Sequence, residues 1–317
     1  MATRVQFTTK SAGTLNCDVV GTLDGASTVV VTVHDLGCNS TSWTHFVQHS
    51  STAEITKRVA WLHINLPGQE ENAENLPQDF KYPSMDELAE AVAEVCEGIH
   101  CPVIGLGEGA GANILARWAL SAPKQLHGIV LIHCTSTTAG YLESLKDKAI
   151  NWKLMGGMNP TAENYLIMHR FGDFTHANNA EQVKAVVEEF HQQLNNKMNS
   201  ANISGYINSF VHRTNIAEKM AALSVPLLLI TGAKANHNHT VHTFYNATLK
   251  LVPDRKKVEF IEIPDIANVV EGAPEKLAES MQFFMQGCGV LGGAPMPHLS
   301  QVSKPGTTMT AMDKSDM

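Results

Sequence analysis

The sequence predicts an α/β fold in which helices cover both faces of a mostly parallel, doubly wound sheet. Two observations support this prediction. Continuous apolar runs such as TVVVTVH and PLLLITG are typical of strands buried on both sides. Helical patterns separate these runs, and such alternation indicates a parallel sheet, which right-handed crossovers make doubly wound.

The first half of the chain supplies most of the strands. The runs VQFTT and LNCDVVGT predict two antiparallel strands, which lead through a Leu23-Asp24-Gly25 turn into a strand over residues 28–34. Further strands are expected over residues 59–66, 101–107 and 126–133.

Three helices are expected between these strands. The segment from residue 84 to 100 begins with the capping box Ser84-x-x-Glu87 and places apolar residues on one face at helical spacing. A second helix over residues 112–122 ends before Pro123. A helical stretch is also expected from Ser42 to Lys57.

The alternation of strands and helices breaks between residues 135 and 215. Three helical patterns follow one another there without a strand, over residues 142–152, 183–194 and 203–210. We therefore expect a helical cap insertion, residues 135–215, over the carboxyl edge of the sheet.

The remaining chain divides into a core and a tail. Residues 1–134 and 216–287 are expected to form the core, which resumes with strands at 226–232 and 257–263 and ends with a helix. Residues 288–317 are rich in Gly, Pro, Ser and Thr and have few large apolar side chains. Because such a composition buries too little surface to offset its ordering entropy, we expect a disordered tail.

The composition excludes several classes of protein. The 317 residues carry a formal net charge of −8, so no basic surface for nucleic acid is expected. The start, MATRVQFTTKSAG, lacks the apolar core of a signal peptide, and no apolar run reaches the roughly 18 residues of a membrane span. Six scattered cysteines without a C-x-x-C pair are typical of free thiols in a reducing compartment. We therefore expect a cytoplasmic protein that is not transmembrane.

The segment GLGEGAGAN, residues 105–113, must form a tight turn between a strand and a helix. It matches the dinucleotide pattern G-x-G-x-x-G/A, but the next strand ends in His133-Cys134-Thr135, without the carboxylate that would hold a ribose. It also fits the nucleophile elbow G-x-S-x-G of the α/β-hydrolase fold, with Gly109 in the nucleophile slot. VHDLGCNSTSW and LPGQ stand where that fold carries its oxyanion loop and a Pro-Gly turn, which favours the elbow.

The catalytic triad of that fold is missing. Counting along the expected order of nucleophile, acid and base places Ala235 at the acid position and Ala267 at the base position. No Asp or Glu occurs between Gly232 and Leu251, and no histidine between Val258 and Gly287. The sequence therefore predicts that the protein is not an enzyme. Gly109 keeps the shape of the elbow, since glycine adopts a positive φ without steric cost.

A family resemblance agrees with this prediction. The segments VHDLGCN, HINLPGQEENAENLPQDFKYPSMDELAE, GLGEGAGANILARWAL and GIVLIH, in this order and spacing, resemble the N-myc downstream-regulated (NDRG) family from about Val5 to Val290. The resemblance implies a non-enzymatic, cytoplasmic protein of α/β-hydrolase fold, tied to stress response, differentiation and signalling, that binds proteins or lipids. It also implies phosphorylation sites in the tail, although this tail lacks the arginines that precede such sites in animal members. The candidate phosphorylation sites are Ser300, Ser303, Thr307 and Thr308, with Thr310 and Ser315 beyond them.

Three polar residues beside the expected elbow are candidate pocket residues. His34 and Asp35 follow the third strand at the carboxyl edge, where ligands bind in open α/β sheets. The alternative for this pair is a hydrogen-bond network that only fixes the loop. Glu108 stands one residue before the nucleophile slot, so we expect a solvated or helix-capping role and no role as a surrogate nucleophile.

A group of histidines offers a second type of candidate site. His237, His239 and His242 lie close in sequence, but no Cys or carboxylate accompanies them in the same loop. We therefore expect a solvated loop, no metal and no cofactor.

The sequence thus predicts a pseudoenzyme that works as a binding or adaptor protein. Its expected partners are signalling or trafficking proteins, or a lipid or small ligand. Two alternatives stay open. One is an unorthodox hydrolase that uses Glu108, a cysteine or the histidines. The other is a small-molecule receptor whose cap encloses a ligand in the vacated pocket.

Overall fold

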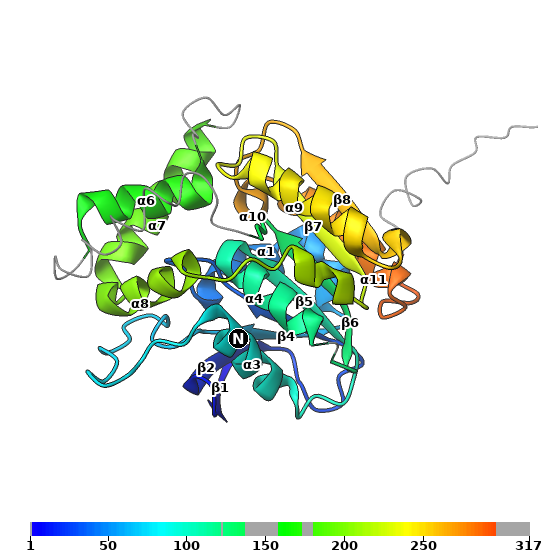
Figure 1. Ribbon diagram of the computed structural model, residues 1–317, viewed down its shortest axis with the longest axis horizontal. Coiled ribbons are helices and arrows are strands. Elements are labelled where there is room, and N and C mark those ends of the chain that lie inside the picture. Colours follow the sequence, from blue (N-terminus) through cyan, green and yellow to red (C-terminus); the bar gives the residue numbers. More distant parts are fainter. Residues whose placement is uncertain (1, 122, 137–157, 173–179, 296–317) are drawn as a thin grey trace, which may run out of the picture.

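An eight-stranded sheet forms the centre of the molecule (Figure 1). The computed structural model describes residues 2–121, 123–136, 158–172 and 180–295. The strand order is β1-β2-β4-β3-β5-β6-β7-β8, in which β2 is antiparallel to β1 and β4 and all other neighbours are parallel. This arrangement confirms the predicted fold class. The strands are β1 (Thr3–Thr9), β2 (Gly13–Val20), β3 (Val29–Val33), β4 (Ala60–Ile64), β5 (Val103–Glu108), β6 (Leu126–Ile132), β7 (Leu227–Gly232) and β8 (Val258–Ile263).

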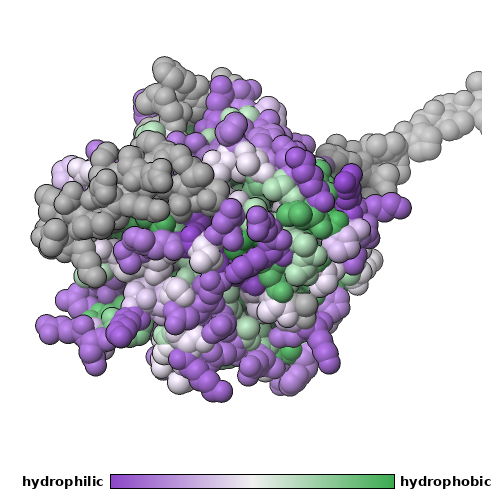
Figure 2. All heavy atoms as spheres, viewed as in Figure 1, coloured by the Kyte–Doolittle hydropathy of each residue, from purple (hydrophilic) through white to green (hydrophobic). Residues whose placement is uncertain are grey.

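Two layers of helices cover the two faces of the sheet. Successive side chains of a strand point to opposite faces, so Val31 packs in one hydrophobic core and Val30 in the other. The first core contains α3 (Met85–Cys96), α4 (Gly109–Leu120) and α9 (Asn238–Leu251); the second contains α1 (Thr44–Gln48), α2 (Ala53–Thr56), α10 (Val269–Gly272) and α11 (Pro274–Gly287). Short 3-10 turns are η1 (Ser40–Trp43), η2 (Ser50–Thr52), η4 (Glu218–Ala222) and η5 (Arg255–Lys257). Figure 2 shows one face of the molecule, where hydrophilic side chains cover most of the surface.

Between β6 and β7, the described residues form three α-helices, which lie beside the sheet at the carboxyl ends of its strands (Figure 1). They are α6 (Pro160–Phe171), α7 (Ala180–Asn196) and α8 (Ser200–Val211). The patterns expected over 183–194 and 203–210 fall within α7 and α8, whereas the pattern over 142–152 lies outside the described residues. The sequence pattern did not indicate α6.

The two connections between cap and core are bonded to each other. Arg213 Nη2 donates to Thr135 Oγ1 at 2.9 Å, and Ile216 N donates to Ser136 O at 3.3 Å. Asn113 of α4 also donates to Thr135 O at 2.8 Å. The chain therefore leaves and re-enters the core at one fixed point above α4.

The helix expected from Ser42 to Lys57 is broken into short pieces. His49 has φ −62° and ψ 141°, an extended conformation that separates α1 from η2. Its Nδ1 accepts a hydrogen bond from Ser51 N at 3.3 Å, so the ring caps the next turn.

The start of the expected tail packs on the core. Leu291 and Ala294 are buried, and Gln282 Nε2 on α11 donates to Pro295 O at 2.8 Å. The boundary expected at residue 288 is therefore too early, because Leu291 supplies an apolar contact that composition alone did not reveal. Residues 296–317, with the candidate phosphorylation sites Ser300, Ser303, Thr307 and Thr308, lie outside the described residues.

The described helices are too short or too polar for a membrane span. Among those in the described part of the chain, none is both long and apolar enough to cross a membrane.

Gly111→Ala should lower the free energy of unfolding by about 3 kcal/mol or more. A methyl group at this position would collide with Val33 O, because α4 lies directly against β3. The matched control is Gly98→Ala, which has open space around it and should change stability by less than about 0.5 kcal/mol. Chemical denaturation of both variants measures the difference, and equal stabilities would contradict the close approach.

Candidate functional site

The turn between β5 and α4 has the shape of a nucleophile elbow without a nucleophile. Gly109 takes φ +53°, the left-handed conformation expected for this position. A methyl group on Gly109 would collide with the carboxylate of Asp35. Asp35, from the loop after β3, therefore fills the slot that a nucleophilic side chain would occupy.

The carboxylate of Asp35 also takes up the main-chain donors of the elbow. Ala110 N donates to Asp35 Oδ1 at 2.8 Å, and Leu36 N bonds the same carboxylate. In α/β-hydrolases, the N–H after the nucleophile and one N–H from the loop after the third strand form the oxyanion hole. Asp35 thus stands where the oxyanion of a substrate would bind.

Two histidines continue from Asp35 toward α9. His169 Nε2, on α6, lies 3.1 Å from Asp35 Oδ1, and His169 Nδ1 lies 3.3 Å from His237 Nε2. Burial alone would raise the pKa of Asp35, but the attraction and hydrogen bond of His169, together with the two N–H groups, hold this pKa below its ordinary value. Burial and the neighbouring His169 lower the pKa of His237 to about 3, so His237 is neutral at physiological pH. Asp35, His169 and His237 thus form a row of groups that can hold a proton. The side chains of Asp35 and His169 are each only 4% exposed, so a substrate has little access to this row.

The positions of the acid and the base carry no titratable side chain. Ala235 lies in the loop after β7, where its N–H donates to Gly232 O, and Ala267 is buried in the loop after β8. Asn268, next to Ala267, donates through Nδ2 to Arg170 O at 3.2 Å. The end of α6 therefore docks where the catalytic base would stand in an active member of this fold.

Glu108 has neither the solvated nor the capping role that we expected. Its side chain is buried and makes no capping hydrogen bond to α4. Glu108 Oε1 accepts a hydrogen bond from Asn268 Nδ2 at 2.6 Å, and Oε2 lies 3.9 Å from Arg170 Nε. Burial raises the pKa of Glu108 to about 7, against the lowering effect of Arg170. The expectation failed because Glu108 is still extended as the last residue of β5, and its side chain meets partners distant in sequence.

His34 fixes the loop after β3. Leu66 N donates to His34 Nε2 at 3.2 Å, so this nitrogen is unprotonated and Nδ1 donates to Asp35 O at 2.9 Å. Tyr206 of α8 donates to His34 O at 3.1 Å. Burial lowers the pKa of His34 to about 4, so the ring is neutral. His34 therefore makes the hydrogen-bond network that was the alternative to a pocket-lining role.

The three histidines near the start of α9 point to different neighbours. His237 faces His169, His242 Nε2 lies 2.6 Å from Glu262 Oε2, and His239 is exposed. Within the described ranges, no group of three or more His, Cys, Asp or Glu side chains is placed to hold a metal ion.

Sequence reasoning missed His169 and Arg170, which α6 brings to the elbow. Arg170 Nη2 pairs with Glu271 Oε1 at 2.9 Å while its Nε faces Glu108. A signal for α6 was present, because Asn159 caps the helix and Pro160 occupies its first turn.

Three surface cavities of about 410, 650 and 760 Å³ are lined by described residues. The largest lies between α1 and α7, and the other two lie along α8. Neither Asp35, Glu108 nor Gly109 lines any of these three. Arg170 and its partner Glu271 join the elbow network to the largest of these three cavities.

Asp35→Asn should lower the free energy of unfolding at neutral pH by about 3 kcal/mol, because it weakens the charge-assisted hydrogen bonds that the buried carboxylate accepts. The pKa of Asp35 is lower in the folded than in the unfolded state, so its contribution is complete above the ordinary pKa of about 3.9 and is lost as the pH falls through the folded value. The difference between wild type and variant, measured by urea denaturation, should therefore shrink on acidification. Asp24→Asn, at an exposed turn, is the control, and a gap that does not depend on pH would contradict the assignment.

Glu108→Gln tests the opposite sign. Because the pKa of Glu108 is raised from 4.5 to about 7, the folded state binds more protons than the unfolded state in this window, and stability falls as the pH rises through it. Glutamine keeps an acceptor for Asn268 but does not ionise. Relative to wild type, the variant should gain up to about 3 kcal/mol between pH 5 and pH 8. A loss over the same interval would show that Glu108 is stabilised as a carboxylate.

Comparisons with known proteins identify the family of the chain. The family model described as the Ndr family matches residues 5–292. An uncharacterized protein of Caenorhabditis elegans is 34% identical over 313 residues, which cover 97% of this chain and 90% of that protein. Protein NDRG1 of Xenopus tropicalis is 29% identical over 298 residues, which cover 90% of this chain and 71% of the relative.

Solved structures share the fold. A thermophilic esterase from Thermogutta terrifontis matches with a TM-score of 0.71 at 18% identity, over 90% of this chain and 99% of the esterase. A hydrolase from Pseudomonas aeruginosa matches with a TM-score of 0.69 at 15% identity, over 89% of this chain and 98% of that chain. At these identities the likeness shows that the fold is that of the α/β-hydrolases. It carries no information about activity. By the family match over nearly its whole length, the chain belongs to the Ndr family.

Proposed function

We propose that this protein is a non-catalytic binding or adaptor protein in cytoplasmic signalling, stress response or differentiation. The observation that carries the proposal is the position of Asp35. Its carboxylate fills the nucleophile slot over Gly109 and accepts the hydrogen bond of Ala110 N, which an oxyanion would need.

The energetics of the elbow support a loss of catalysis. Removing one oxyanion-hole donor from an enzyme of this type costs about 100- to 1,000-fold in kcat, and here the donors already hold Asp35. A substrate would have to displace this buried carboxylate from Ala110 N and His169, and each hydrogen bond to a charged group contributes about 1.5–3 kcal/mol. Gly109, Ala235 and Ala267 also offer no nucleophile, acid or base.

The unorthodox hydrolase remains a second candidate because of one observation at Glu108. Its pKa of about 7 is suited to a general acid or base at neutral pH. Against this candidate, Glu108 is only 2% exposed and is held by Asn268. The receptor alternative has less support, because His169 and Tyr206 of the cap and Asp35 of the core are buried against each other's elements beside the elbow.

A panel of p-nitrophenyl esters from acetate to octanoate tests the proposal. Wild type should release nitrophenol no faster than heat-unfolded protein at the same concentration. Glu108→Gln and His169→Ala should leave that background unchanged, as should the control His212→Ala, an exposed histidine at the end of α8. Turnover by wild type that falls at least 100-fold in Glu108→Gln or His169→Ala, but not in His212→Ala, would establish the hydrolase.

A further inference from the structure

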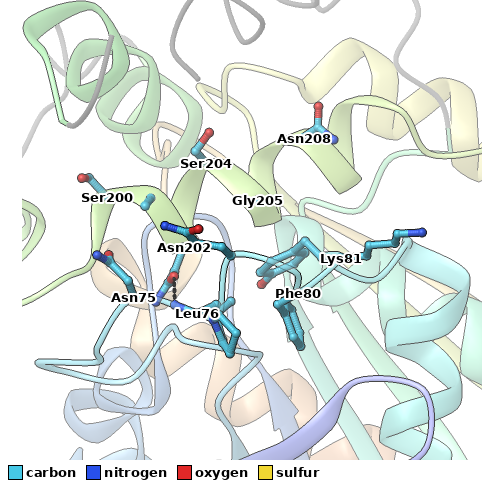
Figure 3. Close-up of a pocket in the computed structure, with 13 residues that line it drawn as sticks. Asn75, Leu76, Phe80, Lys81, Ser200, Asn202, Ser204, Gly205 and Asn208 are labelled. Atoms are coloured by element: carbon cyan, nitrogen blue, oxygen red, sulfur yellow. Dashed lines mark hydrogen bonds between the residues drawn. The ribbon is translucent and has the colours of Figure 1, made fainter. Parts of the chain in front are cut away.

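A continuous groove runs along α8 on the side away from the elbow. Two of the cavities, of about 650 and 410 Å³, share the lining residues Lys81, Tyr82 and Asn208. We call their union the α8 groove. One wall consists of residues 75–78 and 80–87 with Ser11, and the other of the residues of α8 and its C-terminal end that face them. Figure 3 shows the larger part, with α8 on one side and Leu76, Phe80 and Lys81 on the other.

The loop that forms one wall is long and yet fixed. Residues 65–84 contain no helix or strand. Asn202 of α8 donates to Gly68 O at 3.0 Å and to Glu74 O at 2.9 Å. It also accepts from Leu76 N at 3.1 Å (Figure 3). Farther along, Ser209 donates to Pro83 O at 2.6 Å. Side chains of α8 thus hold the loop at both ends of the groove.

Packing of the loop itself does not account for this order. Fixing a backbone costs about 1–2 kcal/mol per residue, but Asn75, Pro77, Gln78 and Lys81 stay exposed and bury little surface in return. Loops of this length without secondary structure are usually functional in compact domains. A wall that is ordered in advance needs little further ordering when a ligand binds.

The chemistry of the groove suits a polypeptide main chain. The amide side chains of Asn75, Gln78 and Asn208 can donate and accept at once, which matches the alternating N–H and C=O groups of an extended peptide. Ser204 keeps the α8 wall low where the ligand would lie, and Gly205 lets the ring of Tyr82 pack directly on α8. Phe80 and Tyr82, with ring centroids 6.3 Å apart, offer aromatic surface to a side chain of the ligand.

The larger part of the groove favours a partner with a negative charge. Asp86 pairs with the buried Arg117, and Glu87 closes the capping box with Ser84. Lys81 is exposed and has no hydrogen-bond or ion-pair partner among the described residues. Among the residues that line the larger part of the groove, Lys81 is the one with a charged side chain, whereas the smaller part carries charges of both signs.

We propose that the α8 groove binds an extended segment of a partner protein, with an acidic side chain opposite Lys81. The inference rests on the proposed binding function and names its surface and the chemistry of its partner. The 12 residues of α8 span about 18 Å, so the groove accommodates roughly five or six extended residues.

The experiment selects peptides from a phage-displayed library of random 12-residue sequences on the immobilised full-length protein. Fluorescently labelled copies of the enriched peptides are then titrated by anisotropy against wild type and variants. Enriched peptides should carry Asp or Glu. Ser204→Arg, which fills the groove, and Lys81→Glu should each weaken binding at least tenfold.

Two matched variants control the result. Lys219→Glu reverses an exposed lysine outside the groove, and Gln192→Ala removes an amide from the cavity beside α7. Both should change the affinity less than twofold. A melting temperature within about 2 °C of wild type shows that Lys81→Glu and Ser204→Arg are folded. If either variant is not folded, Asn208→Ala takes its place, because Asn208 is exposed.

The outcomes separate the groove from the proposed function. The proposal for the α8 groove would be overturned if no peptide were enriched more strongly than on an unrelated immobilised protein. It would also be overturned if the peptides bound wild type and both groove variants equally well. In the second case the protein still binds partners, elsewhere on its surface. Ester turnover in the panel described above would instead overturn the non-catalytic function itself.

Discussion

The buried carboxylate of Asp35 is the constraint on which the rest of the site depends. A charge in the protein interior is tolerated only where hydrogen bonds and an opposite charge compensate for lost water. Ala110 N provides one such bond and fixes the carboxylate over Gly109, so no side chain fits in that slot. His169 provides the second partner and comes from the cap. Cap and core are therefore coupled, because moving α6 away would leave Asp35 without that partner.

Arg170, which follows His169 in α6, also couples the cap to the core, on the other side of the elbow. Arg170 lies between Glu108 and Glu271, and its guanidinium is 5.1 Å from the ring centroids of both Phe171 and Phe190. A cap that encloses a substrate leaves space between itself and the elbow. Here ion pairs and aromatic rings occupy that boundary, so the end of α6 behaves as part of the core.

Features set by neighbouring residues could be predicted from the sequence, and features set by distant partners could not. The strands follow from apolar runs, and the positive φ of Gly109 follows from the shape of the turn. The burial of Glu108 depends on Asn268, which lies 160 residues later, and the pairing of Asp35 with His169 spans 134 residues. With 15 histidines in the chain, no local pattern distinguishes the one that reaches the elbow.

Helix α8 gives a physical reason to keep an elbow that has lost its nucleophile. Tyr206 donates to His34 O beside the elbow and stacks on Tyr82, with ring centroids 6.3 Å apart, under the loop of the α8 groove. The neighbouring residue Gly205 lines the groove, and Asn202, one turn earlier, holds its outer wall. The same helix is thus fixed from the inside by the elbow and fixes the loop on the outside. On the proposed function, a rigid elbow serves binding at the surface, because any shift of His34 would be passed through Tyr206 to the wall that receives the partner.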